Sequence, residues 1–221
     1  MKIAKRYYLL AGGALLMSGL VSAFVLLNPV RTWSSPPTYI VDDRGMASIS
    51  DSDGGISQTV RAITSSDAWN GAGAGNVINA TAGSVAAWQL GDGIPMLNFD
   101  DPVNVCTGSC LAATFTGYIE RVGRGKPKYH YIDADIVTNN NYAWTSTAEP
   151  DGCSSEFYIE GVQVHEIGHG LGIGHTNIAG ATMFPSVASC DNGPATTEAD
   201  DNAALCALYG CDDSGGGCDL G

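Results

Sequence analysis

The chain has 221 residues, which suits one domain behind a targeting segment and is enough to bury a hydrophobic core. Its 10 Lys and Arg stand against 23 Asp and Glu, so the formal net charge is −13. A surface of this sign repels nucleic acid and anionic membranes, and we exclude nucleic acid as a partner.

The N-terminal residues predict an export signal. A basic start is followed by an apolar stretch from Leu9 to Leu20 and by small residues suited to cleavage, which predicts a signal peptide over residues 1–23. The apolar run continues to Leu27, near the roughly 18 to 20 residues that span a bilayer. The alternative is therefore an uncleaved anchor over residues 1–30. We expect a secreted, extracellular protein, or alternatively a periplasmic or membrane-anchored one.

Short strands are expected through the first half of the exported part. Residues 28–37 have the composition of an exposed linker. Apolar residues at helical spacing predict an amphipathic helix over residues 56–69. Residues 71–95 are rich in Gly, Ala and Asn and give little signal. Strand patterns occur at residues 38–41, 96–99, 111–122 and 129–138.

A further helix is predicted to begin at Ser154 or Ser155. Acidic residues near this start are favoured by the helix dipole. An apolar stripe would pack on the sheet, and this leaves His165 and His169 on the opposite side, facing a cleft. The stripe consists of Phe157, Val164, Ile167 and Leu171.

The last predicted helix starts at Thr197. This residue can cap the helix, and Asp200 would complete a capping box. Gly210 ends the helix, because glycine tolerates the backbone conformation of a helix terminus. Residues 211–221 form a short tail rich in glycine.

The segment from His165 to His175 reads H-E-x-x-H-x-x-G-x-x-H, and each fixed position has a mechanical reason. His165 and His169 lie four apart, so on a helix both can bind one metal ion. Glu166 projects beside that ion and can act as a base on a bound water. Gly172 lets the helix end, and the chain can then return His175 to the same ion. Three imidazoles leave one position of a tetrahedral zinc open, which is the arrangement of a catalytic site.

The motif resembles the zinc signature of the metzincin metallopeptidases, which also carry a methionine turn downstream. Here Met183 follows the last histidine by eight residues. Met183 followed by an aromatic residue and Pro185 is most similar to the matrixins. Asp133–Val137 with Trp144 beyond it resembles the matrixin edge strand, and residues 197–210 resemble the matrixin C-terminal helix.

The resemblance implies an α+β, zincin-like fold. Its parts are a twisted mixed β-sheet with a long helix and an active-site helix, then a small C-terminal subdomain with the methionine turn and one helix. The catalytic domain would span residues 33–210, with the tail at 211–221. The implied protein is a compact, bacterial-type secreted endopeptidase, monomeric, with one catalytic Zn²⁺. It would act on proteins or peptides, with the extracellular matrix as a place of action.

The resemblance also assigns roles to single residues. Glu166 would take a proton from the attacking water and pass it to the departing amine. Met183 would form an apolar floor under the imidazoles. The alternative function is a zinc-containing adhesion or binding module without catalysis, but such a module needs no base beside the metal. An extended substrate along the edge strand and its pocket would involve Asp135, Ile136, Pro185 and Val187.

Three departures from the matrixin pattern are visible. Matrixins are commonly kept latent by a cysteine in a Pro-Arg-Cys-Gly segment, which is absent here; the first cysteine, Cys106, lies inside the expected catalytic domain. Animal matrixins bind a second, structural zinc through three histidines and an aspartate, whereas only His130 remains outside the signature. Val187 stands where many matrixins place a pocket tyrosine, so the pocket shape differs.

Seven cysteines fit an oxidising compartment. Cys106 and Cys110 could close a small loop, and Cys211 and Cys218 could staple the tail. At least one thiol is then free or paired outside the chain, because three cysteines remain: Cys153, Cys190 and Cys206.

Calcium is a further expected ligand of the acidic chain. No twelve-residue calcium loop is present, so the expectation depends on clustered carboxylates alone. The candidates are Asp100, Asp101, Asp212 and Asp213.

Overall fold

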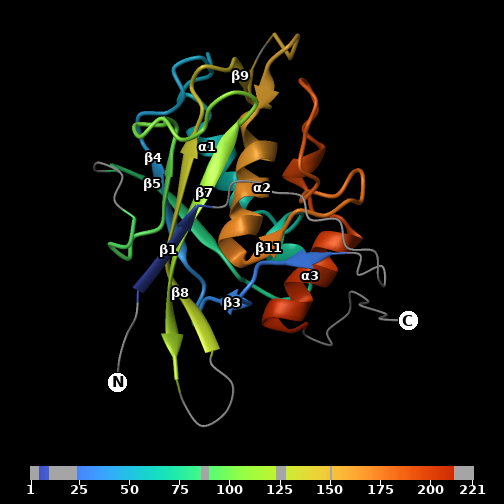
Figure 1. Cartoon of the computed structure of the whole chain (residues 1–221). Helices are drawn as coiled ribbons and strands as arrows, with labels where there is room; N and C mark the ends of the chain where they lie inside the picture. The colour runs from blue at the N-terminus through green and yellow to red at the C-terminus, as the bar shows by residue number, and fades with distance from the viewer. Residues whose placement is uncertain (1–4, 10–23, 86–89, 123–127, 150, 212–221) are drawn as a thin grey trace.

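The structure, a computed structural model, describes residues 5–9, 24–85, 90–122, 128–149 and 151–211. These residues form a curled, mixed β-sheet and three α-helices, in agreement with the α+β class expected (Figure 1). Most of the expected signal peptide lies outside the described residues, so that expectation stays a prediction. Among the described residues, no helix has the length and apolar character needed to cross a membrane.

Seven strands form the main sheet in the order β1-β7-β8-β6-β4-β5, with β3 paired to β8. β7 is antiparallel to both β1 and β8, and the other pairs are parallel. The four strands expected from the sequence are confirmed to within one residue at each end. The strands are β1 (Lys5–Leu9), β3 (Arg31–Thr32), β4 (Thr38–Asp42), β5 (Asn79–Gly83), β6 (Met96–Asn98), β7 (Ala112–Arg121) and β8 (Lys128–Thr138).

β8 is an interior strand, not the edge strand that the sequence suggested. Asp135 pairs with Phe115 of β7 on one side and with Met96 of β6 on the other. Asp135 and Ile136 are both 0% exposed. The expectation that an extended substrate lies along these two residues is therefore wrong. An alternating pattern alone does not reveal whether a strand has one neighbour or two.

The three helices are α1 (Ile56–Thr64), α2 (Ile159–Leu171) and α3 (Ala199–Tyr209), with short 3₁₀ turns at Trp69–Gly71 and Gly193–Ala195. Figure 1 shows α2 between the sheet and α3. α2 packs on both α1 and the sheet, and its apolar stripe is buried as expected. The buried stripe residues are Val164, Ile167 and Leu171, each 0% exposed, with Phe157 half-buried beside them.

The first helix is shorter than expected. It ends at Thr64, so the prediction of a helix over residues 56–69, and of a long first helix, is wrong. After it, the Ser65 hydroxyl accepts the Asp67 N–H at 2.9 Å, a local bond that competes with helix continuation. Trp69 follows in a separate turn, where its Nε1–H donates to the Val164 carbonyl at 2.8 Å. The indole thus ties this turn to α2.

α2 begins later than predicted, at Ile159 rather than at Ser154 or Ser155. The Glu156 carboxylate accepts the N–H groups of both serines, at 2.7 and 2.8 Å, which holds them in a turn. The next residues form β10 (Phe157–Tyr158), which pairs with β9 (Trp144–Thr145). A strand pairing far along the chain therefore overrides the local helix signal.

The cap of α3 lies one residue later than predicted. Glu198 is the N-cap, and it forms a reciprocal capping box with Asp201. The Thr197 hydroxyl donates instead to the Ala68 carbonyl. The shift moves the aspartate of the capping box from Asp200 to Asp201.

The segment expected as an exposed linker is packed against the domain. Arg31 is 3% exposed and belongs to β3. The Trp33 Nε1–H donates to the Gly170 carbonyl at 2.9 Å, near the end of α2. Just before it, β2 (Val25–Leu26) pairs with β11 (Ile173–Gly174). The expectation of a linker is wrong because these contacts come from elements far away in the sequence.

Three disulfides join described cysteines. Cys106–Cys110 closes the small loop that the sequence indicated. Cys211 bonds to Cys206 rather than to Cys218, because Gly210, with φ +81°, ends α3 and brings the two Cα atoms to 5.0 Å. Cys218 lies outside the described residues. The third bond joins Cys153 to Cys190.

Candidate metal centre

The end of α2 and the turn after it position three histidines. His165 and His169 lie one turn apart on α2, and Gly172 ends the helix in the left-handed region with φ +110°. A Cβ on Gly172 would lie 2.8 Å from the Arg31 carbonyl oxygen, so a side chain does not fit there. The chain continues through β11, and His175 follows directly.

The ring nitrogens of the three histidines converge. Nε2 of His175 lies 3.2 Å from Nε2 of His165 and 3.1 Å from Nε2 of His169. Nitrogen ligands at about 2.0–2.1 Å around a tetrahedral ion are about 3.3 Å apart. The spacing of the three atoms therefore fits a shared zinc ion.

Two of the rings have a fixed tautomer. Nδ1 of His165 lies 2.6 Å from the Thr182 carbonyl oxygen, and Nδ1 of His169 lies 2.8 Å from that of Ile173. A carbonyl only accepts, so both Nδ1 atoms carry the hydrogen and both Nε2 atoms present lone pairs. Lone pairs facing one another repel unless a cation lies between them. This arrangement of outer hydrogen bonds is typical of metal-binding imidazoles.

The surroundings favour the neutral, ligating form of these rings. Burial lowers the pKa of His169 well below its usual value, and the neighbouring histidines add to this. Burial and the nearby His165 lower the pKa of His175 to about 4. Protons therefore compete weakly with a metal ion at neutral pH.

Glu166 lies next to the first histidine on α2 and is 6% exposed. The Thr114 hydroxyl, on β7, donates to Glu166 Oε2 at 2.6 Å. Burial raises the pKa of the Glu166 carboxyl, while His165 and the Thr114 hydrogen bond oppose the rise. A carboxyl group with a raised pKa beside a metal site suits a general base. The sequence identified Glu166 but gave no sign of Thr114.

Met183 lies in a turn that packs against α2, where it is 1% exposed. A Cβ on Gly168 would collide with the Met183 sulfur, so glycine at this position lets the methionine approach the helix. The Asp201 carboxylate accepts the N–H groups of Thr182 and Met183 at 2.8 and 3.0 Å. Since the Thr182 carbonyl accepts from His165, Asp201 is linked to the first histidine of the cluster through the turn.

Asp201 was missed as a site residue. The sequence predicted the helix that contains it but assigned the cap to its neighbour Asp200. Of the pocket residues expected beyond the methionine, Pro185 is exposed and Val187 is half-buried against the core. Asp135 and Ile136, in contrast, are buried residues of an interior strand of the sheet.

Other candidate sites are less suited to the expected chemistry. Cys153, Glu156 and Cys190 bring three donor atoms close together, but the two sulfurs form a disulfide. Asp100 accepts from Asn140 and from the Asp101 N–H, and Asp101 accepts from the Cys106 N–H. These two carboxylates shape a loop, and the other calcium candidates, Asp212 and Asp213, lie outside the described residues.

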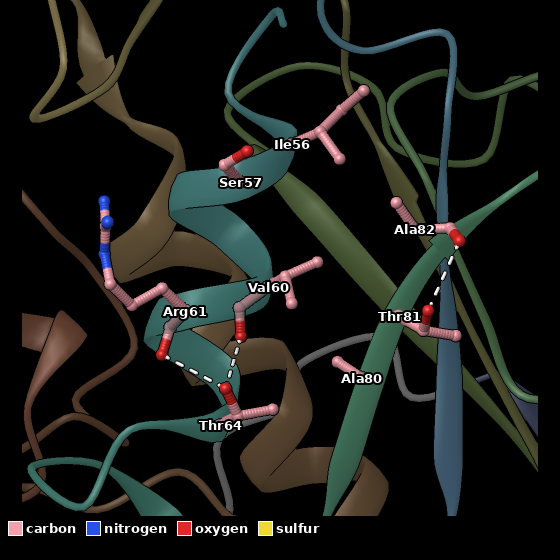
Figure 2. Close-up of a pocket in the computed structure, with 8 residues that line it drawn as sticks. All are labelled: Ile56, Ser57, Val60, Arg61, Thr64, Ala80, Thr81 and Ala82. Atoms are coloured by element: carbon pink, nitrogen blue, oxygen red, sulfur yellow. Dashed lines mark hydrogen bonds between the residues drawn. The ribbon is translucent and has the colours of Figure 1, made fainter.

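A groove of about 430 Å³ lies between α1 and β5 (Figure 2). It shares no residue with the histidine cluster, and Arg61 is the one charged side chain in its lining. The groove therefore has no part in the chemistry of the metal centre. Its lining consists of Ile56, Ser57, Val60, Arg61, Thr64, Ala80, Thr81 and Ala82.

Comparison with known proteins points to one family. Residues 109–210, somewhat under half of the chain, match the sequence model of the matrixin family, and this range contains the three histidines, Glu166 and Met183. A 59-residue segment is 41% identical to the metalloendoproteinase 5-MMP of Arabidopsis thaliana. That segment covers 27% of this chain and 16% of the plant protein, so the chain aligns with a small part of its relative.

Proposed function

We propose that this chain is an exported, matrixin-like zinc endopeptidase. The observation that supports it most strongly is the convergence of three histidines beside Glu166, with Nε2 of His175 3.2 and 3.1 Å from Nε2 of the other two. The matched family range and the relative's name agree with this chemistry. Three protein ligands are the number found in catalytic zinc sites, whereas structural sites have four.

In the proposed reaction, each residue of the site has a separate role. Bound zinc would supply Lewis acidity toward a water molecule and a peptide carbonyl. Glu166 accepts the proton of the attacking water and delivers it to the departing amine. The carbonyls of Thr182 and Ile173 hold two imidazoles in the tautomer that presents Nε2. Asp201 fixes the turn that carries the first of these carbonyls.

The strand beside the site is β7, since Thr114 of this strand contacts Glu166. β1 pairs with β7 only over Phe115–Ile119, so on that edge residues 112–114 have no strand partner among the described residues. An extended peptide could add its backbone hydrogen bonds there. We propose that Pro185 and Val187 wall the pocket for the residue after the cut, and that the enzyme acts as a monomer on exported or extracellular proteins.

Substitution of the base tests the proposal. Glu166→Ala should retain one zinc per chain by elemental analysis and lose nearly all cleavage of casein or gelatin. His130→Ala is the matched control, because His130 lies outside the cluster with its Nδ1 3.4 Å from the Ser34 hydroxyl. Zinc without cleavage in the parent would instead identify a binding module. Absence of stoichiometric zinc from folded parent protein would contradict both functions.

A further inference from the structure

A buried threonine contacts the base from a different element of the fold. Thr114 is 3% exposed and lies on β7, 52 residues before Glu166. Its Oγ1 lies 2.6 Å from Glu166 Oε2 and 2.9 Å from the Glu166 backbone oxygen. One hydroxyl therefore touches both the carboxyl group and the main chain of the same residue.

A hydroxyl group has one hydrogen and two lone pairs, so it can serve either protonation state of a carboxyl group. When Glu166 is ionised, the Thr114 hydroxyl donates to Oε2. When Glu166 has accepted a proton on Oε1, Oε2 is still an acceptor, and the Thr114 hydroxyl continues to donate to it. Both arrangements use the distances observed, and neither requires the side chain to move.

We propose that Thr114 is a positioning residue that holds the Glu166 carboxyl group in one orientation throughout the proton cycle. This inference rests on the proposed peptidase function for its catalytic consequence, but the orientation itself is a property of the fold. The hydrogen bond occupies Oε2, while Oε1 accepts no bond from the described residues and is left for the proton of water. A hydrogen bond to an ionised carboxylate is roughly twice as strong as one between neutral groups, so it can hold the carboxyl group in one orientation.

A neighbouring residue offers a matched control. Thr116 lies two positions along β7, on the same face, and is 0% exposed. Its Oγ1 accepts from Arg31 Nη1 at 3.2 Å, whereas the side-chain hydrogen bonds to Glu166 from described residues come from Thr114. Replacing either threonine by valine removes one buried hydroxyl at nearly constant volume. A general loss of stability should therefore affect both variants alike.

The experiment compares Thr114→Val, Thr114→Ser and Thr116→Val as zinc-loaded full chains. Thr114→Val should lower kcat about 10- to 100-fold with KM within about twofold, because a hydrogen bond to a charged group is lost. Thr114→Ser keeps the hydroxyl and should retain kcat within about threefold. Thr116→Val should match the parent. If Thr114→Val does not fold, Thr114→Ala replaces it.

Crystal structures of the same variants give a readout independent of cleavage. The Glu166 carboxyl group should have one orientation in the parent and in Thr114→Ser, and several in Thr114→Val. Should Thr114→Val keep both the parental orientation and the parental kcat, the positioning role is refuted while the peptidase function stands. If the parent cleaves no substrate but Glu166 has several orientations in Thr114→Val and one in the parent, the positioning role is supported and the peptidase function is refuted.

Discussion

Two clusters in this molecule bring three potential metal ligands together, and they differ in what surrounds the donor atoms. In each cluster the three atoms lie within 4.8 Å of one another. In the first, Nδ1 of His165 and Nδ1 of His169 contact backbone carbonyl oxygens, and Nε2 of each faces Nε2 of His175. In the second, the two cysteine sulfurs are bonded to each other, and Glu156 accepts from Ser154 and Ser155.

The difference shows that proximity alone does not make a metal site. The histidine cluster leaves lone pairs pointing at a common centre, so a cation is needed to offset their repulsion. The cysteine cluster has already satisfied its donors through a covalent bond and through backbone N–H groups. Removing residues from each cluster should therefore have different consequences, and five experiments separate them.

The largest effect is expected from loss of a metal ligand. His169→Ala should abolish stoichiometric zinc binding and lower kcat/KM about 1,000-fold or more, because a site with two protein ligands holds the ion weakly. Elemental analysis after gel filtration and peptide-cleavage kinetics measure both quantities. If His169→Ala still bound one zinc per chain at the parental affinity, the histidine cluster would not be the zinc site.

A smaller effect is expected from the turn that supports His165. Asp201→Ala removes the acceptor for the N–H groups of Thr182 and Met183 and should weaken zinc binding about 10- to 100-fold. Competition with a chromophoric chelator measures the affinity. Asp191→Ala is a suitable control, since Asp191 accepts from the Gly193 N–H in an exposed turn. Equal affinity in both variants would mean that the turn does not act on the metal.

The second cluster should respond in stability rather than in metal content. Replacing both Cys153 and Cys190 by Ser opens a loop spanning 37 residues and should lower the free energy of unfolding by about 2–4 kcal/mol. Zinc should stay at one per chain. Urea unfolding and metal analysis check both expectations, and a fall from two zinc ions per chain in the parent to one in the variant would reveal a second ion held by this cluster.

The smallest effect is expected from pH on zinc-free protein. The folded pKa of His175 is about 4, below its usual value of 6.5, so the unfolded chain binds more protons between these values. The stability contribution of neutral His175 is thus complete above about pH 6.5 and is lost as the pH falls toward 4. Melting temperatures from pH 7 to 4 should fall less in His175→Ala than in the parent.

The pKa of Glu156, in the second cluster, is also lowered, so its contribution to stability is likewise lost as the pH falls, but at lower pH. Hydrogen bonds from Ser155 and Ser154 lower the pKa of its carboxyl group to about 2 from 4.5. The contribution of ionised Glu156 to the free energy of unfolding is complete above about pH 4.5 and is lost only as the pH falls toward 2. Glu156→Gln should therefore melt like the parent in its response between pH 7 and 5. A change in that interval would show that the carboxyl group has another partner.

Much of the fold could be predicted from local pattern. The strands at residues 38–42 and 128–138 follow from alternation, and the apolar stripe of α2 follows from helical spacing. The predictions are wrong where a contact with a residue far away in the sequence fixes the local structure. The start of α2 is displaced by pairing between β9 and β10, and the expected linker is fixed by Trp33 against Gly170.

The sequence by itself determined the composition of the metal centre. His165 and His169 are four apart on one helix, Gly172 ends the helix, and His175 follows within reach, so eleven consecutive residues bring the three histidines together. Only the tertiary structure decided that Thr114 holds Glu166, that Asp201 supports the turn, and that β8 is interior. These contacts join residues on different elements, and local periodicity contains no information about which elements become neighbours.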